Sequence, residues 1–311
     1  MQHDYNGFPN QRIAHEITAA FPKNAKVIAH RDLNLLVPLF DKAGAKILVP
    51  NTGAGVTVSR SAPVIRDMNT AWDISKHAEA RAPVSLGIVE ANVRSTFSQP
   101  LAPWAKHVLD MPIKFPGTDV RVPSALASVA PAIQRIIDIE MHLNPRYGEY
   151  FAYLSVHQAE LDAGERMREN PYHVDGFQGP RWKEKHPVNH SYLLTDALPT
   201  VFYPVGFPLD HIDPRFDDVY AEFAYRIETG RDVSTWRAED YDLILMDAYC
   251  VHRGDIAKRP VSRTWLRISW ETRIFDRLGN SHNPLFDYAW NMVARDCDLR
   301  VRPRLAVAAA A

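Results

Sequence analysis

The sequence predicts a mainly β protein with flanking helices, whose core is an antiparallel jelly roll or barrel. Beyond residue 147 the chain consists of short runs rich in aromatic and β-branched residues, separated by turn-forming clusters. This texture is typical of antiparallel strands. The 23 prolines and 14 glycines are spread along all 311 residues, which favours many short elements joined by turns. The predicted strands cover residues 149–158, 190–195, 200–205, 242–252 and 263–275.

The last of these stretches alternates most clearly. Successive side chains of a strand point to opposite faces, so two sets of residues separate. Arg263 and Arg267 should therefore share one face, about 13 Å apart at about 3.3 Å per residue. One face carries Arg263, Trp265, Arg267 and Ser269, and the other carries Thr264, Leu266, Ile268 and Trp270.

The N-terminal part of the chain contains one clear helical pattern, over residues 128–143. Ser128 is a suitable N-cap, and Pro131 is tolerated in the first turn. Apolar residues then recur at helical spacing, which predicts one face that packs into a core. That face carries Ile133, Ile136, Ile137 and Met141.

The charge balance argues against several classes of partner. Lys plus Arg (36) nearly cancels Asp plus Glu (37), so the chain has no overall field that would attract nucleic acid or an anionic membrane. We find no apolar run long enough to span a bilayer and no signal-peptide pattern at the N-terminus. The two cysteines form no zinc signature or disulfide framework. We therefore expect a cytoplasmic protein with a small-molecule substrate, and the oligomeric state stays open.

Four histidines stand two residues before an acidic residue: His30, His77, His173 and His211. With 13 histidines and an acidic fraction of 37 in 311, chance alone predicts about 1.5 such pairs, so spacing cannot choose among them. His77 lies in a charged stretch that we expect to be solvated, and His211 lies in a proline-flanked surface turn. His30 follows a short strand but has no matching distant His and Arg.

His173 has the right context for a metal site. It follows a predicted strand, and the tight turn Asp175-Gly176 comes directly after it. His252 ends another predicted strand 77 residues after Asp175, and Arg263 opens the next strand eleven residues later. Two histidines and one carboxylate on one face of a metal leave open positions, an arrangement that suits non-haem Fe(II). An arginine nearby can hold the far carboxylate of a dicarboxylate through a bidentate pair.

This ordered set resembles that of the Fe(II)/2-oxoglutarate-dependent oxygenases over roughly residues 147–276. The resemblance implies a double-stranded β-helix, a cupin-like jelly roll, with Fe(II) held by His173, Asp175 and His252. It also implies that O₂ oxidises the co-substrate 2-oxoglutarate to succinate and CO₂ while a small molecule, such as an amino acid or a natural-product intermediate, is oxidised. The halogenating branch of the family has a small residue where this chain has Asp175. The carboxylate therefore favours hydroxylation or a related oxidation such as desaturation or ring closure.

The spacing of the family favours Arg263 as the anchor for 2-oxoglutarate. Arg267 with Ser269 remains the alternative, because an Arg-x-Ser pair on this strand binds that carboxylate in some relatives. The hydroxyl of Tyr192 is a further candidate for the co-substrate. Residues that follow the His-x-Asp turn are candidates for substrate contact: Gln178, Arg181 and Trp182.

We expect a single catalytic domain over residues 1–311, in which residues 147–276 form the double-stranded β-helix. Residues 1–146 form an α+β elaboration that packs against the barrel and helps to shape its mouth, and residues 277–311 form a C-terminal segment. Two alternatives remain open: a cupin-like metal enzyme that does not use 2-oxoglutarate, and a binding module without a metal. Cupin-like sites usually add further His or Glu ligands, and iron titration separates the second alternative.

Overall fold

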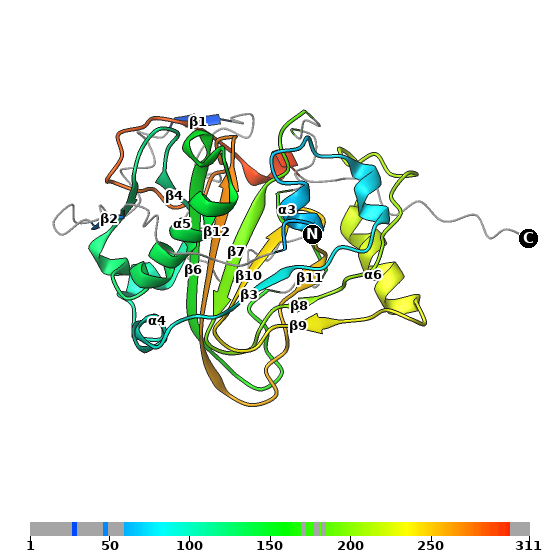
Figure 1. Ribbon diagram of the computed structural model, residues 1–311, viewed down its shortest axis with the longest axis horizontal. Coiled ribbons are helices and arrows are strands. Elements are labelled where there is room, and N and C mark those ends of the chain that lie inside the picture. Colours follow the sequence, from blue (N-terminus) through cyan, green and yellow to red (C-terminus); the bar gives the residue numbers. More distant parts are fainter. Residues whose placement is uncertain are drawn as a thin grey trace, which may run out of the picture.

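A computed structural model describes residues 27–29, 46–48, 59–168, 172–176, 181 and 185–298. Its centre is a six-stranded sheet in which every neighbouring pair is antiparallel. Figure 1 shows the middle strands side by side, with helix α5 lying across them. In order, the sheet contains β3 (Val84–Ile88), β10 (Asp242–Asp247), β7 (His190–Thr195), β12 (Val261–Glu271), β6 (Phe151–Leu161) and β4 (His107–Lys114).

A smaller sheet faces the large one. It has the order β11 (His252–Arg253), β8 (Val201–Phe202) and β9 (Trp236–Arg237), and an antiparallel bridge between His173 and His252 extends it at β11. From β6 onward the chain passes from sheet to sheet: large, small (His173), large, small twice, large, small, large. Four strands of the large sheet (β6, β7, β10 and β12) thus alternate along the chain with the three strands and the His173 bridge of the small sheet, and this connection is that of a jelly roll, the double-stranded β-helix. The predicted fold class is confirmed.

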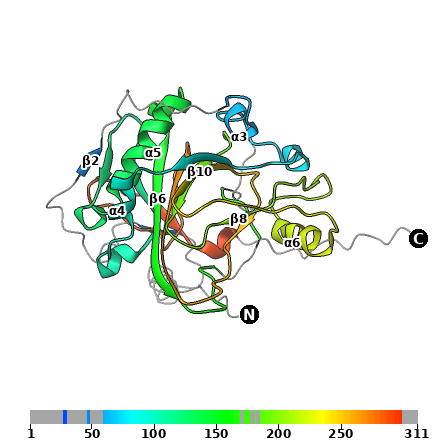
Figure 2. The same cartoon turned by 60° about the horizontal axis from the view of Figure 1, so that its bottom comes forward.

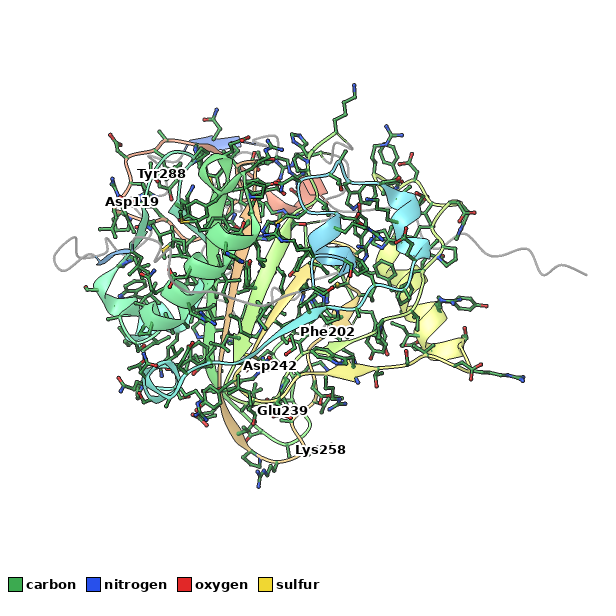
Figure 3. All side chains as sticks on the ribbon, viewed as in Figure 1. Asp119, Phe202, Glu239, Asp242, Lys258 and Tyr288 are labelled. Atoms are coloured by element: carbon green, nitrogen blue, oxygen red, sulfur yellow. The ribbon has the colours of Figure 1, made fainter. Side chains whose placement is uncertain are left out.

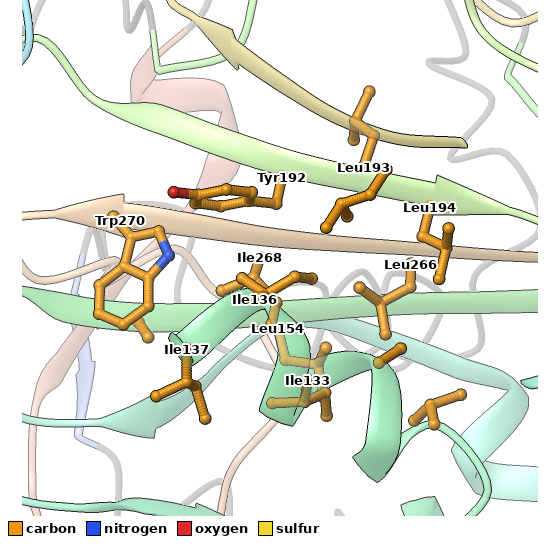
Figure 4. Packing of buried hydrophobic residues seen from close by; sticks show 14 of the residues in the cluster. Ile133, Ile136, Ile137, Leu154, Tyr192, Leu193, Leu194, Leu266, Ile268 and Trp270 are labelled. Carbon is orange, nitrogen blue, oxygen red and sulfur yellow. The ribbon is translucent and has the colours of Figure 1, made fainter. Parts of the chain in front are cut away.

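Helix α5 (Ala130–Leu143) covers the outer face of the large sheet. The four residues predicted to share one face of β12 are at most 2% exposed, and three of them join the isoleucines of α5 in the main core. Figure 4 shows Leu266, Ile268 and Trp270 beside Ile133, Ile136 and Ile137. Figure 2 shows α5 on one side of this sheet and β8 on the other.

The predicted helix was right in place but wrong at two residues. Val129 is the N-cap of α5 and no side chain caps the helix, so Ser128 does not have the predicted role. Met141 is 42% exposed, whereas Glu140 beside it is fully buried. The buried face therefore includes a carboxylate, which the apolar periodicity cannot reveal.

Both edges of the large sheet come from the N-terminal part of the chain. β3 pairs with β10 and β4 pairs with β6, so these strands complete the sheet that carries the jelly roll. The packing of residues 1–146 as a whole and the division of the chain into domains stay predictions.

The remaining elements surround these sheets. β1 (Val27–Ala29) pairs with β13 (Asn291–Val293), and β2 (Lys46–Leu48) pairs with β5 (Val120–Val122). No helix among the described residues is both long and apolar enough to cross a bilayer. The other helices among the described residues are α3 (Pro63–Arg66), α4 (Ala91–Phe97) and α6 (Val219–Thr229), with short helical turns at Ile74–Ala78, Pro103–Lys106, Ser124–Leu126, Tyr147–Glu149 and Arg295–Asp298.

Candidate metal centre

His173 and His252 lie opposite each other in the small sheet. The backbone N–H of His173 donates to the carbonyl of His252 at 3.0 Å, and the reverse bond is 2.9 Å. Their ring centroids are 4.3 Å apart. Pairing of this kind brings side chains 79 positions apart in the sequence onto one face of the sheet. The backbone therefore fixes the separation of the two imidazoles.

Asp175 completes the group. One ligand atom from each of His173, Asp175 and His252 can be chosen such that all three lie within 4.8 Å of one another. Gly176 follows with φ 80°, and a Cβ at this position would approach the Asn189 side chain to 2.0 Å. The turn that aims Asp175 inward thus requires a glycine, as the Asp-Gly pair predicted.

The imidazole of His252 is held in one orientation. Its Nδ1 lies 2.9 Å from the carbonyl oxygen of Cys250, which can only accept, so Nδ1 carries the proton. Nε2 then presents its lone pair and lies 3.9 Å from Oδ2 of Asp175. Burial lowers the pKa of His252, although the charge of Asp175 opposes this, so the ring is neutral at pH 7. A neutral imidazole oriented by a backbone carbonyl is the usual state of a histidine ligand.

Asp175 is an ionised carboxylate with a strong counter-charge. Nη1 of Arg267 lies 2.7 Å from its Oδ2. Burial alone would raise the pKa of Asp175, but Arg267 and the two histidines outweigh it and hold the pKa below its usual range. Asp175 therefore needs no proton loss before it binds a cation.

Arg267 also binds a carboxylate from the N-terminal part of the chain. Its Nη2 donates to Oδ1 of Asp110 at 2.7 Å. Asp110 stands at a register shift of β4, with φ 45°, and its N–H donates to Oγ of Ser155 at 3.0 Å. The sequence offered no signal for Asp110, since neither its spacing nor a motif connects it to a residue 157 positions away.

These residues fit a metal ion. Two imidazoles and one carboxylate form the donor set that suits non-haem Fe(II), and all three residues are at most 9% exposed. The ligand atoms already lie close together, so binding requires little reorganisation. Among the described residues, this is also the single cluster of three or more His, Cys, Asp or Glu side chains with metal-binding geometry.

Arg263 lies on the same face of β12 as Arg267, four residues nearer the start of the strand. It is 3% exposed, and its Nε donates to the carbonyl of Ala197 at 2.9 Å. The guanidinium also contacts the sulfur of Met167. Burial lowers the pKa of Arg263 to about 10, so it remains charged at pH 7. Within the part of the chain that the structure describes, Arg263 forms no ion pair, whereas Arg267 has two.

The other predicted co-substrate contacts fare differently. Tyr192 points to the outer face of the large sheet, away from the metal ligands, and its hydroxyl donates to Oε2 of Glu140 on α5 at 2.8 Å. Figure 4 shows its ring among the core side chains next to Ile268. Its predicted contact with 2-oxoglutarate is therefore wrong. Ser269 does lie on the inner face, where its hydroxyl is 2.9 Å from that of Ser191.

The predicted substrate contacts are only partly described. Gln178 and Trp182 lie outside the described residues. Arg181 is half-buried, and its Nη1 donates to Oδ1 of Asp276 at 2.8 Å. This ion pair connects the segment after the His-x-Asp turn to the chain beyond β12.

The structure describes two of the three other histidines that stand two residues before an acidic residue. His77 is 1% exposed and packs between aromatic rings, so the expectation of a solvated side chain was wrong. The side chain of His211 is 43% exposed and lies 3.6 Å from Glu222, as expected for a surface turn. His30 lies outside the described residues.

Comparison with known proteins gives structural similarity alone. No protein-family profile matches the chain, and no curated protein matches it by sequence. Solved structures match over most of the chain at low identity, with TM-scores below 0.4. EvdO2 from Micromonospora carbonacea var. aurantiaca, complexed with 2-oxoglutarate, is 13% identical with a TM-score of 0.38, over 70% of this chain and 92% of that one.

Two further structures are similar to the same degree. EctD from S. alaskensis with bound Fe is 12% identical with a TM-score of 0.38, over 85% of this chain and 96% of that one. A 2OG-Fe(II) oxygenase family oxidoreductase from Burkholderia pseudomallei is 11% identical with a TM-score of 0.30, over 62% and 80%. At this distance the activity has to be argued from the residues of the site. The structural neighbours of this chain include Fe(II)/2-oxoglutarate-dependent oxygenases.

Proposed function

We propose that the protein is an Fe(II)/2-oxoglutarate-dependent oxygenase that hydroxylates a small molecule or oxidises it in a related way, forming succinate and CO₂. In this proposal His173, Asp175 and His252 bind the metal and Arg263 binds the distal carboxylate of 2-oxoglutarate. The observation that carries it is a buried arginine without an ion pair, on the inner face of the strand that also reaches the metal ligands.

A buried guanidinium is costly unless an anion compensates it. The direct contacts of Arg263 are a carbonyl and a thioether, and the carboxylates of Asp196, Asp240 and Asp255 act on it only from beyond ion-pair distance. A dicarboxylate that enters the barrel supplies the missing anion at one end and reaches the metal with the other. This supports a co-substrate with two acidic ends and favours Arg263 over Arg267, whose charge Asp175 and Asp110 already balance.

The protein's own residues prepare the site for this reaction. Cys250 fixes the tautomer of His252, and Arg267 keeps Asp175 ionised. Arg263 orients the co-substrate through a charge-assisted pair. When bound, Fe(II) supplies the redox chemistry through which O₂ oxidises 2-oxoglutarate and the substrate. Three protein ligands leave open positions for those two molecules.

The two alternatives are less well supported. A cupin-like enzyme without 2-oxoglutarate usually has additional His or Glu ligands, and the cluster among the described residues has three members. Such an enzyme would also leave Arg263 without a direct anionic partner. A binding module without a metal would not require an ionised Asp175 next to two histidines.

The test is a screen of small carboxylic and amino acids for succinate release under Fe(II), 2-oxoglutarate and O₂. We expect at least one compound to stimulate release above the uncoupled rate, and His252→Ala to abolish both rates. Wild-type protein that binds Fe(II) but neither binds nor consumes 2-oxoglutarate would favour the cupin-like alternative. Wild-type protein that binds no Fe(II) would favour the module without a metal.

A further inference from the structure

The turn between β10 and β11 carries His252 and is closed by Asp247. Oδ1 of Asp247 accepts the N–H of Tyr249 at 3.0 Å, and its backbone carbonyl accepts the N–H of Cys250 at 3.2 Å. Cys250 in turn accepts the Nδ1 proton of His252. Two hydrogen bonds to Asp247 therefore fix the turn, one to its carboxylate and one to its backbone carbonyl, and a third bond, to the Cys250 carbonyl, orients the imidazole.

Asp247 lies on the outer side of the large sheet, away from the metal centre, and is only 2% exposed. Its remaining oxygen, Oδ2, faces Nη1 of Arg81 at 3.4 Å. Burial raises the pKa of Asp247, and the charge of Arg81 opposes this. The partner that balances this buried carboxylate thus comes from the N-terminal part of the chain.

Arg81 is itself fixed from the other side. Both of its terminal nitrogens donate to Oδ2 of Asp67 at 2.9 Å, and Asp67 also pairs with Lys76 at 3.2 Å. The guanidinium lies 4.9 Å from the ring centroid of Tyr249. Arg81 is 2% exposed, so it has little freedom to move.

Tyr249 attaches the same turn to the N-terminal part a second time. Its hydroxyl accepts the N–H of Asp73 at 2.9 Å, and its ring stacks on Trp72 with centroids 6.3 Å apart. His77 contacts the ring from the side at 5.0 Å. Residues 67–81 thus contact both ends of the turn Asp247–Tyr249: Arg81 pairs with Asp247, and Asp73 and Trp72 contact Tyr249.

We propose that Arg81 and Asp247 are positioning residues for the metal centre: they rigidify the turn whose Cys250 carbonyl sets the orientation and tautomer of His252. This rests on the proposed metal-binding role of His252. It also gives the N-terminal part a function in the chemistry that goes beyond completing the sheet. Partners that orient a histidine ligand typically change metal affinity by about 10–100-fold when they are lost.

Asp247→Asn is the informative variant, because its remaining oxygen still accepts the Tyr249 N–H while the charge that meets Arg81 is lost. The matched control is Asp242→Asn on the same strand (Figure 3). Asp242 is also buried and also bonds the N-terminal part, through Ser85 Oγ at 2.8 Å, but it lies at the far end of β10. Tyr249→Phe, which removes the bond to Asp73, is a milder second variant.

Two measurements are needed on the full chain. Titration with Co(II) gives the dissociation constant. We expect this constant to rise at least tenfold in Asp247→Asn, because loss of an orienting partner typically weakens metal binding by about 10–100-fold. In Asp242→Asn we expect it to rise less than threefold. Long-range ¹H–¹⁵N spectra of the metal-free protein give the tautomer of His252, assigned with His252→Ala. We expect the Nδ1–H form in wild type and a mixture in Asp247→Asn. Thermal midpoints without metal verify that each variant is folded.

The outcomes separate the two proposals. Wild-type protein that does not bind Co(II) refutes the metal centre, and the tautomer spectra still decide whether Asp247 orients His252. An unchanged tautomer and Co(II) constant in folded Asp247→Asn overturn the positioning role. Equal losses in Asp247→Asn and Asp242→Asn overturn it as well, because general loosening of β10 would then explain the effect.

Discussion

Replacing Arg263 by Met should weaken 2-oxoglutarate binding without unfolding the protein. Arg263 is 3% exposed and has no ion pair among the described residues, so its charge is available to a ligand. A hydrogen bond to a charged group contributes about 1.5–3 kcal/mol. Loss of the charged pair should therefore raise the apparent constant for 2-oxoglutarate by about 10- to 150-fold, at 1.4 kcal/mol per factor of ten.

The matched variant is Arg267→Met on the same face of the same strand. Its loss leaves Asp175 and Asp110 as buried carboxylates without their cation. Removing one partner of a buried ion pair costs about 3–5 kcal/mol, so this variant should lower the free energy of unfolding. Arg263→Met removes a buried charge that has no direct ion-pair partner among the described residues. The free energy of unfolding of this variant should therefore change little.

The assay combines urea unfolding with 2-oxoglutarate-dependent succinate release at fixed Fe(II) and substrate. We expect the 2-oxoglutarate constant to respond to Arg263→Met and the stability to respond to Arg267→Met. The reverse result, a stable Arg267→Met with a raised constant beside an unaffected Arg263→Met, would refute the reasoning from charge balance and make Arg267 the anchor.

Four further predictions follow from the same contacts. His252→Ala should lose Fe(II) binding in calorimetry, and an unchanged affinity would exclude it as a ligand. Tyr192→Phe should lower the free energy of unfolding by about 1 kcal/mol, because its hydroxyl bonds Glu140, and leave the 2-oxoglutarate constant unchanged. A fragment of residues 1–146 should show no cooperative unfolding transition in circular dichroism, since β3 and β4 pair with later strands. Burial and the charge of Arg81 lower the pKa of His77 from 6.5 to about 3 in the folded protein. As the pH falls from 6.5 toward 3, the unfolded chain therefore binds a proton that the folded protein does not, and the free energy of unfolding decreases. At pH 5 this costs about 2 kcal/mol relative to pH 8, and urea unfolding of His77→Phe should lack that difference.

Local patterns predicted much of the fold. Strand β12 was predicted from its alternation, and its four predicted apolar-face residues are all buried in the structure. The ordered ligands were predicted because a His-x-Asp pair before a glycine and a histidine after a strand are both short-range signals. The structure places all three side chains within reach of one ion.

Where both faces of a strand are covered, the pattern fails. All six residues of β7 are buried, so no alternation shows which way Tyr192 points, and an error of one position turns it to the other face. Long-range ion pairs fail for another reason: nothing local connects Asp110 to Arg267 or Arg81 to Asp247. Burial of His77 was missed because the charged residues around it in the sequence form ion pairs with Asp67 and Arg66 in the fold.

The two inward-facing arginines of β12 have different roles: Arg267 balances carboxylates at the metal centre, and Arg263 is the candidate anchor for the co-substrate. Both point inward and both are buried, so sequence position alone cannot assign their roles. Their neighbours do: β4 supplies Asp110 to Arg267 and the His-x-Asp turn supplies Asp175, which makes Arg267 part of the metal centre's own charge balance. No described carboxylate forms a direct ion pair with Arg263; Asp196, Asp240 and Asp255 act on it from beyond ion-pair distance. Among the described residues, Arg263 is therefore the arginine of this strand that is open to a direct pair with a ligand carboxylate, and this favours an anionic co-substrate at Arg263.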